Sequence, residues 1–287
     1  MFPLPSVDFE ELLLECRKKN KYGNVLFEYY RYVGQLLSTA MKIEFKSPAI
    51  RNIEINEFAI LIGLLNRIVR LMLSNMKLSS DGTQGETTAI LDRCILESCV
   101  KLIWLCQNKQ VMSFNRFIAD GLKADLKLKG NILSNIQQRN GKELPVEKRM
   151  LNSIEKYIQD SGLTEDDIAN SKRLPDMASM LKSIKVADVY YVVIMNMGSH
   201  SVHGTWSSLK KDYFIIEDGS VYPQDHLTPT HVNQLISVSI MALYAMKAFF
   251  NHILDNDEDL LNEISLLSDE IIEKIVEIYH EKELKID

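Results

Sequence analysis

Apolar residues recur along most of this chain at spacings of three and four, the repeat of an α-helix with one buried face. This spacing predicts helices over about residues 7–19, 24–45, 54–76, 87–106, 111–138, 147–159, a short stretch after Thr164, 176–201, 233–252 and 259–282. The 287 residues include only 12 Gly and 7 Pro, with no Pro between Pro48 and Pro145, so the central helices can be long. The pattern predicts an all-α fold, a multi-helix bundle.

One segment departs from the helical spacing. Between Gly204 and Pro229, β-branched and aromatic residues flank the dipeptide Asp218-Gly219 on both sides. Asp-Gly between two such runs favours a two-residue hairpin turn, because both turn positions need a positive φ. We expect a small β-hairpin insertion near residues 211–224.

The length and the hydrophobic content bound the domain organisation. With 46% hydrophobic residues, a chain of 287 residues can bury a sizeable core. Pro48 separates the first two predicted helices from the rest. We expect residues 1–50 to form an N-terminal helical segment packed on the core, and residues 51–287 to form the main helical domain.

The sequence shows no targeting or membrane segment. The chain does not open with the basic region and uninterrupted apolar stretch of a secretory signal. No run of about 18 apolar residues free of charge occurs either. The cysteines, with three on one apolar helix, fit neither a zinc knuckle nor a disulfide framework. We expect a soluble, cytoplasmic protein with reduced thiols and no membrane partner.

The charge distribution leaves two interpretations open. A net charge of −6 argues against a protein that holds nucleic acid by bulk electrostatics. Residues 101–149, however, contain ten Lys and Arg against four Asp and Glu, and residues 251–287 contain three Lys against twelve acids. The two segments could pair with each other, or the basic one could meet phosphate groups.

The most apolar predicted helix carries a narrow charged stripe. At 100° per residue, with Arg93 at 0°, Glu97 falls at about 40° and Lys101 at about 80°, while apolar residues occupy most of the remaining circumference. A helix this apolar is usually buried, so the stripe predicts a slot to solvent or an internal cleft. The simpler alternative is an intrahelical Arg93–Glu97 salt bridge with a minor stabilising effect.

A second, largely apolar helix predicted over residues 188–203 carries hydrogen-bonding side chains on one face. Ser199, His203 and Asn196 fall within about 60° of one another on its helical wheel. Buried polar groups need partners, and the charged pair of the first helix would provide them. We expect the two helices to share one polar site.

Four histidines raise the question of a metal, since imidazole binds zinc and iron. They are His200, His203, His226 and His231. The spacing of three between the first two is less usual than His-x3-His, and no carboxylate motif accompanies them. Walker, Gly-x-Ser-x-Gly and His-Glu-x2-His motifs are also missing from the sequence. We expect no metal and no cofactor.

The candidate residues coincide with a family pattern. The motifs are, in chain order, Arg93-x3-Glu97, Phe114-Asn115-Arg116-Phe117, Tyr191 and Ser199-x3-His203-Gly204. In this order they resemble a widespread bacterial family of helical proteins of unknown function, over roughly residues 56–250. That family in turn looks like a distant relative of the HEPN helical domains.

The HEPN resemblance implies a metal-independent ribonuclease, among toxin or phage-defence effectors, with RNA as the partner. HEPN nucleases carry an Arg followed after four to six residues by a His on one helix. This chain has no such spacing, so Arg93 and His203 would have to meet across two helices.

RNA cleavage without a metal needs a base near the 2′-hydroxyl and a cation on the phosphate. Within the resemblance, the catalytic set is Arg93, Glu97, Ser199 and His203, and the substrate-binding set is Arg116, Asn196, Tyr191 and His200. Glu97 would orient the guanidinium, and Ser199 or Asn196 would fix the imidazole tautomer.

Two other functions use the same residues. The polar groups could form a buried network that specifies helix packing in a non-enzymatic interaction module. The slot at Arg93 could instead bind an anion or nucleotide in a sensor. The apolar stripe of the last predicted helix leaves room for a homodimer.

Overall fold

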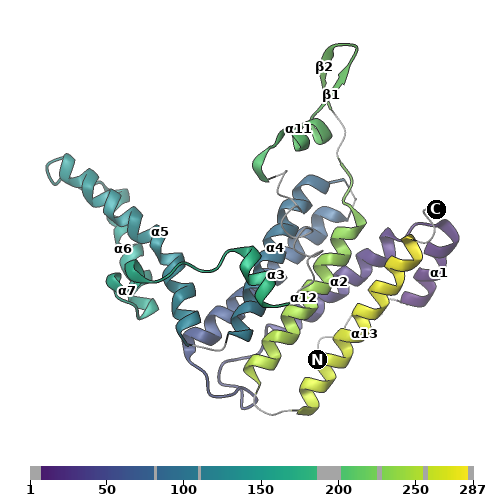
Figure 1. The fold of residues 1–287 in the computed structure, drawn as a ribbon, viewed down its shortest axis with the longest axis horizontal. Helices are drawn as coiled ribbons and strands as arrows, with labels where there is room; N and C mark the ends of the chain where they lie inside the picture. Colours follow the sequence, from purple (N-terminus) through teal and green to yellow (C-terminus); the bar gives the residue numbers. More distant parts are fainter. Residues whose placement is uncertain are drawn as a thin grey trace. The chain divides into compact units, whose positions relative to one another are not determined.

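The computed structural model describes residues 8–80, 83–108, 111–185, 202–224, 228–254 and 258–283. The fold is all-α with one small antiparallel hairpin, as the sequence predicts (Figure 1). The helices are α1 (Phe9–Lys19), α2 (Gly23–Ala40), α3 (Ile55–Ser79), α4 (Gly85–Gln107), α5 (Val111–Gln138), α6 (Pro145–Ser161), α7 (Glu165–Asn170), α8 (Met177–Ser183), α11 (Trp206–Asp212), α12 (Val232–Ile253) and α13 (Glu258–Glu283).

The chain divides into two compact units. Unit 1 comprises Met1–Ile53, Leu61–Gln107 and Met177–Asp287. Unit 2 comprises Glu54–Ile60 and Asn108–Asp176. The first two helices therefore belong to the same unit as α4, α12 and α13.

Helix α12 is the centre of unit 1. It packs against α4, α2 and α13, while α2 also contacts α1 and α4 contacts α8. By length and composition α12 is the one helix in the described ranges that could cross a membrane, but 67% of its most apolar window is buried inside the protein. Most of this apolar surface is therefore covered by the neighbouring helices of unit 1.

Unit 2 is built on the long amphipathic helix α5. Helix α5 packs against α6 and α7. The core of unit 2 consists of small and branched apolar side chains: Ala119, Leu122, Ile132, Ile154, Ile158 and Ile168. Helix α5 has the predicted bounds, because its apolar residues keep a regular helical repeat over 28 residues.

The hairpin follows the prediction. Strand β1 (Phe214–Glu217) pairs with β2 (Ser220–Pro223) in antiparallel register, with Phe214 opposite Pro223. Asp218 and Gly219 form the turn with φ of 50° and 75°, the positive values that a type I′ turn requires. The short helix α11, which precedes the hairpin, was not predicted.

One predicted helix is interrupted. A continuous helix over residues 176–201 was expected, but α8 ends at Ser183. The amide of Ile184 bonds back to the carbonyl of Met180, and Lys185 takes a left-handed conformation with φ of 57°. A left-handed residue closes a helix end without disturbing the apolar spacing, so the spacing alone could not reveal the break. Residues 186–201 lie outside the described ranges.

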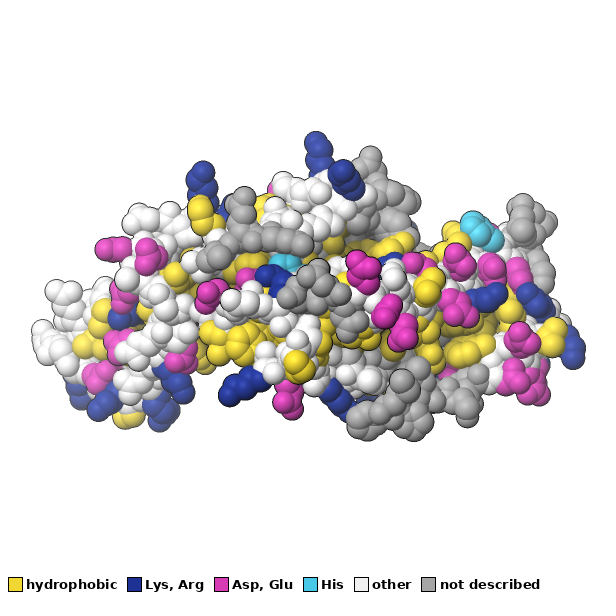
Figure 2. All heavy atoms as spheres, turned by 90° about the horizontal axis from the view of Figure 1, so that it is seen from below, with side chains coloured by type: hydrophobic (Ala, Val, Ile, Leu, Met, Phe, Trp, Pro, Cys, Tyr) yellow, Lys and Arg dark blue, Asp and Glu magenta, His cyan; other side chains and the backbone are white. Residues whose placement is uncertain are grey.

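The ion pairs of the basic segment lie within unit 2. Lys129 contacts both Glu155 and Glu165, and Arg139 contacts Glu147. Figure 2 shows acidic and basic side chains interspersed over one face of the protein, without one large patch of either sign. Within the described ranges, the basic segment is therefore partly neutralised by its own neighbours.

Candidate functional site

Arg93 and Glu97 form the charged pair that their spacing predicts. Both lie on α4, and Arg93 Nε donates a hydrogen bond to Glu97 Oε1 over 3.0 Å. The Arg93 side chain is 18% exposed and that of Glu97 33% exposed. The pair is thus partly withdrawn from water, where an ionic interaction is less screened than at the surface.

The pair leaves part of the guanidinium unused. Arg93 Nη1 is buried and has no hydrogen-bond partner among the residues that the structure describes. A guanidinium carries five N–H donors in a fixed fork, and a buried donor without an acceptor is unfavourable by about 1–3 kcal/mol. Arg93 is therefore held by Glu97 at one edge and lacks an acceptor at another.

His203 stands at the end of a helical turn with its side chain exposed. Gly204 follows with φ of 54°, in the left-handed region that favours glycine at helix ends. This explains physically why a Gly follows the His in the Ser-x3-His-Gly motif. Within the described ranges, no interaction links His203 to the Arg93–Glu97 pair.

Four of the predicted site residues lie outside the described residues. They are Tyr191, Asn196, Ser199 and His200. Their proposed contacts with Arg93 and Glu97 remain predictions. The part of the predicted two-helix site that the structure brings together is the Arg93–Glu97 pair.

Arg116, the remaining predicted residue, lies in unit 2 on α5. Its guanidinium donates to two main-chain carbonyls of the segment after α7, those of Lys172 and Arg173. One turn further on, Asp120 Oδ1 accepts from the amide of Leu174 over 3.1 Å. Arg116 therefore takes part in fixing this segment, and its predicted role in substrate binding stays a prediction.

Sequence reasoning missed a buried polar cluster in unit 1, made by Tyr30, Asn75 and Asp92 on α2, α3 and α4. All three are at most 1% exposed. The Asn75 amide donates to Asp92 Oδ1 and, over 3.2 Å, to the Tyr30 hydroxyl. Burial raises the pKa of Asp92 to about 8, against a weaker opposing effect of the Asn75 hydrogen bond. This carboxyl is therefore largely protonated at neutral pH.

Two oxygens of this cluster, Asp92 Oδ2 and Asn75 Oδ1, have no hydrogen-bond partner in the described part of the chain. Protonation turns the carboxyl into a donor beside an amide that has a vacant acceptor. The sequence carries a signal for this cluster. Asp92 lies 100° before Arg93 on the helical wheel of α4, among apolar positions. Asn75 lies on the apolar stripe of α3, three residues after Met72 and seven after Ile68.

The histidines that the structure describes show no metal arrangement. Among the described residues, no group of three or more His, Cys, Asp and Glu side chains could hold a metal ion. His231 caps α12 instead, because its Nδ1 accepts from the amide of Asn233 over 3.2 Å. Burial lowers the pKa of His231, and the nearby Lys282 and Lys211 lower it further. His200 and His226 lie outside the described residues.

The fold and the site define an all-α protein with a half-buried Arg-x3-Glu pair on a core helix. Residues 58–221, more than half of the chain, match a family described as "Family of unknown function (DUF5677)". The chain belongs to this family. The match begins close to the expected residue 56 and ends before the expected residue 250. Comparisons with curated proteins and with solved structures give no match.

Proposed function

We propose that this protein is a metal-independent, RNA-directed effector of the endoribonuclease type, in which Arg93 binds a phosphate of the RNA. The observation that carries the proposal is the Arg93 guanidinium, whose side chain is 18% exposed and whose Nη1 donor has no hydrogen-bond partner among the described residues. A phosphate oxygen is the acceptor that best fits a guanidinium, because it pairs with the fork through charge-assisted hydrogen bonds.

Glu97 supports the proposed role by holding the guanidinium in place. Its carboxylate accepts from Nε at 3.0 Å, so the remaining donors of Arg93 are oriented before the substrate arrives. Negative charge grows on the phosphate oxygens in the transition state of cleavage. A fixed, partly desolvated cation stabilises that charge more than a mobile one in water does.

His203 supplies the base in this proposal. The 2′-hydroxyl loses its proton to the imidazole and attacks phosphorus, the bond to the 5′-oxygen breaks, and the 5′-oxygen takes a proton from water. The products are a 2′,3′-cyclic phosphate and a 5′-hydroxyl. The exposed side chain of His203 suits a group that meets a large substrate. Ser199 or Asn196 would fix the imidazole tautomer.

The resemblance to HEPN domains suggests the biological class, a toxin or a phage-defence effector. A second candidate function rests on the same guanidinium: Arg93, with its side chain only 18% exposed, could bind a free anion or nucleotide as a sensor without turnover. The two functions differ in whether the bound phosphodiester is broken.

A cleavage assay in EDTA tests the proposal. Purified protein is incubated with total RNA and tRNA, and the products are examined for cyclic phosphate ends. We expect cleavage by the natural protein and its loss in His203→Ala and Arg93→Gln, each checked for folding by circular dichroism. Glu97→Gln should retain part of the activity, because the guanidinium keeps its charge but loses its orientation.

Matched controls separate the site from general charge effects. His280→Ala removes another exposed imidazole of unit 1, and Arg31→Gln removes another Arg with an intrahelical Glu partner, Glu28. Both should cleave as the natural protein does. A different outcome would favour the sensor function over the nuclease function. In that case neither the natural protein nor any variant cleaves RNA, and an added nucleotide raises the melting temperature of the natural protein but not that of Arg93→Gln.

A further inference from the structure

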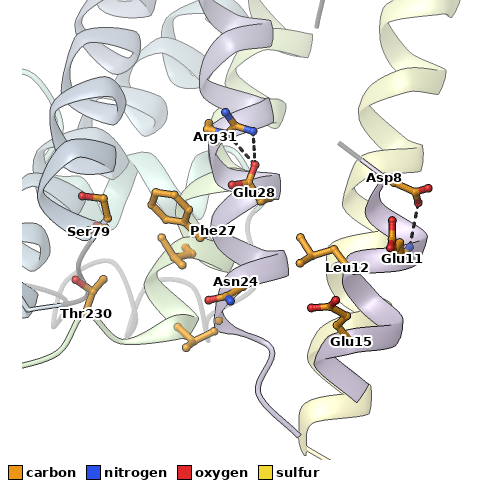
Figure 3. A pocket seen from close by; sticks show the side chains of 14 residues that line it. Asp8, Glu11, Leu12, Glu15, Asn24, Phe27, Glu28, Arg31, Ser79 and Thr230 are labelled. Carbon is orange, nitrogen blue, oxygen red and sulfur yellow. Dashed lines mark hydrogen bonds and ion pairs between the residues drawn. The ribbon is translucent and has the colours of Figure 1, made fainter. Parts of the chain in front are cut away.

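Unit 1 contains a groove of about 810 Å³ that includes none of the residues discussed above as catalytic. It is lined by α1, α2, the end of α3 and the start of α12 (Figure 3). Sites for small organic molecules typically measure about 300–1,000 Å³. The groove therefore has the size of a ligand site.

One end of the groove is acidic. Its walls carry four carboxylates and one cation, which are Asp8, Glu11, Glu15, Glu28 and Arg31. Arg31 already pairs with Glu28, whose Oε2 accepts from Nε over 2.7 Å. Among the described residues, Glu15 has only a weak exposed pair with Lys19 at 3.5 Å. The Glu11 carboxylate has no partner in the described ranges, so this end favours a cation and disfavours an anion.

The acidic residues of α1 form a row. Glu11 and Glu15, four residues apart, lie on one face of α1 with an axial spacing of about 6 Å. Asp8, the N-cap residue, lines the groove just before them, and its Oδ1 accepts from the Glu11 amide over 3.0 Å. Figure 3 shows Leu12 and Glu15 directed from α1 toward α2. A row of this kind matches amines separated by short methylene chains better than it matches a single metal ion, which needs its ligands around one point.

The other end of the groove offers hydrogen-bond acceptors. Ser79, only 7% exposed, lies in its wall, and its hydroxyl has no hydrogen-bond partner among the described residues. Ser79 is the last residue of α3 and Ser80 follows it, at the end of the helix where the helix dipole favours a cation. The start of α12 does not offset this, because His231 caps its first amides.

Apolar side chains complete the lining. Leu12, Phe27, Val232 and Leu235 line the groove along with the carboxylates and the hydroxyls. In Figure 3, Phe27 points from α2 toward Ser79 and Thr230. Such a surface is suited to methylene groups, and an aromatic face also attracts ammonium.

We propose that this groove binds a linear polyamine, with ammonium groups on the α1 carboxylates, methylene groups over Phe27 and Leu12, and a terminal ammonium at Ser79 and the end of α3. This site is separate from the proposed ribonuclease function. Either can fail while the other holds.

The test is a titration of the full chain with spermidine, followed by calorimetry and by the melting temperature at low salt. We expect saturable binding that raises the melting temperature, because the ligand binds the native state only. The double variant Glu11→Gln/Glu15→Gln should bind roughly tenfold more weakly. Ser79→Ala should bind several-fold more weakly without any fall in the melting temperature of the ligand-free protein, since the buried hydroxyl has no partner among the described residues to lose.

The matched control is Glu10→Gln/Glu273→Gln, which removes two exposed carboxylates that do not line the groove. It should bind spermidine as the natural protein does. Equal weakening in both double variants would reduce the effect to net charge and overturn the proposal. Three other results would also overturn it. They are an equal rise in melting temperature with Mg²⁺ at the same charge concentration, no binding of spermidine, and binding of a lysine-rich peptide in place of spermidine.

Discussion

The buried carboxyl of Asp92 makes the stability of this protein depend on pH in an unusual direction. Asp92 is 1% exposed, and burial raises its pKa to about 8 from an ordinary value of 3.8. Because the folded-state pKa lies above the unfolded one, the folded state holds a proton that the unfolded state releases between these values. The stability that this bound proton gives the folded state is therefore fully present below about pH 4 and is lost as pH rises toward 8.

Asp92→Asn removes this dependence while keeping the shape of the side chain. An amide is neutral at every pH and, like the protonated acid, offers an oxygen acceptor to the Asn75 amide, with an NH₂ donor group where the acid has its O–H. One pKa unit corresponds to about 1.4 kcal/mol. Relative to the natural protein, the free energy of unfolding of the variant should therefore rise by up to that amount per pH unit between about pH 4.5 and 7.5.

Urea unfolding followed by far-UV circular dichroism measures the free energy of unfolding of both proteins across this range. All other titrating groups are shared, so the difference between the two isolates Asp92. We expect the difference to grow steadily with pH and to total several kcal/mol, on the order of 3–4, by pH 7. A constant difference, or one that favours the natural protein more as pH rises, would show that the carboxyl is ionised in the folded state.

Three further predictions concern local structure. Gly85→Ala should destabilise the protein by about 1–3 kcal/mol, because a Cβ there would lie 2.3 Å from the Pro229 carbonyl oxygen. Gly63→Ala should instead stabilise α3 slightly, because a Cβ there would meet no described atom within 4 Å apart from the local backbone of its own helix. Thermal melts of both variants separate the two outcomes. Thr164→Ala should lose about 1 kcal/mol in urea unfolding, because Thr164 Oγ1 accepts from the amide of Asp167 at the start of α7. Because the pKa of His231 is lowered in the folded state, its protonation favours the unfolded state, and the natural protein should lose stability below about pH 6.5. His231→Asn should remove this loss.

Most of the helices and the hairpin could be predicted because each has a local signal. Helix α5 is amphipathic along its whole length, and Asp218-Gly219 needs the positive φ values that the turn shows. The Arg93–Glu97 pair is equally local, since residues four apart meet on any helix.

Features that depend on packing were harder to predict. The end of α8 rests on a left-handed Lys185, which leaves the apolar repeat intact. The Asn75–Asp92 contact joins two helices, and it could be found only by asking why polar residues occupy apolar stripes. Which compact unit contains Arg116 is likewise set by long-range contacts, and spacing along the chain carries no record of them.

The most direct test of the proposed function is RNA binding at Arg93, measured without turnover. A single-stranded RNA with 2′-O-methyl groups cannot be cleaved by its own 2′-hydroxyl, and its fluorescence anisotropy in EDTA gives the affinity as a function of salt. Loss of one phosphate contact in Arg93→Gln should weaken binding and reduce the slope of log affinity against log salt by about 0.7. Equal affinities and equal slopes for the natural protein and the variant would contradict a phosphate site at Arg93.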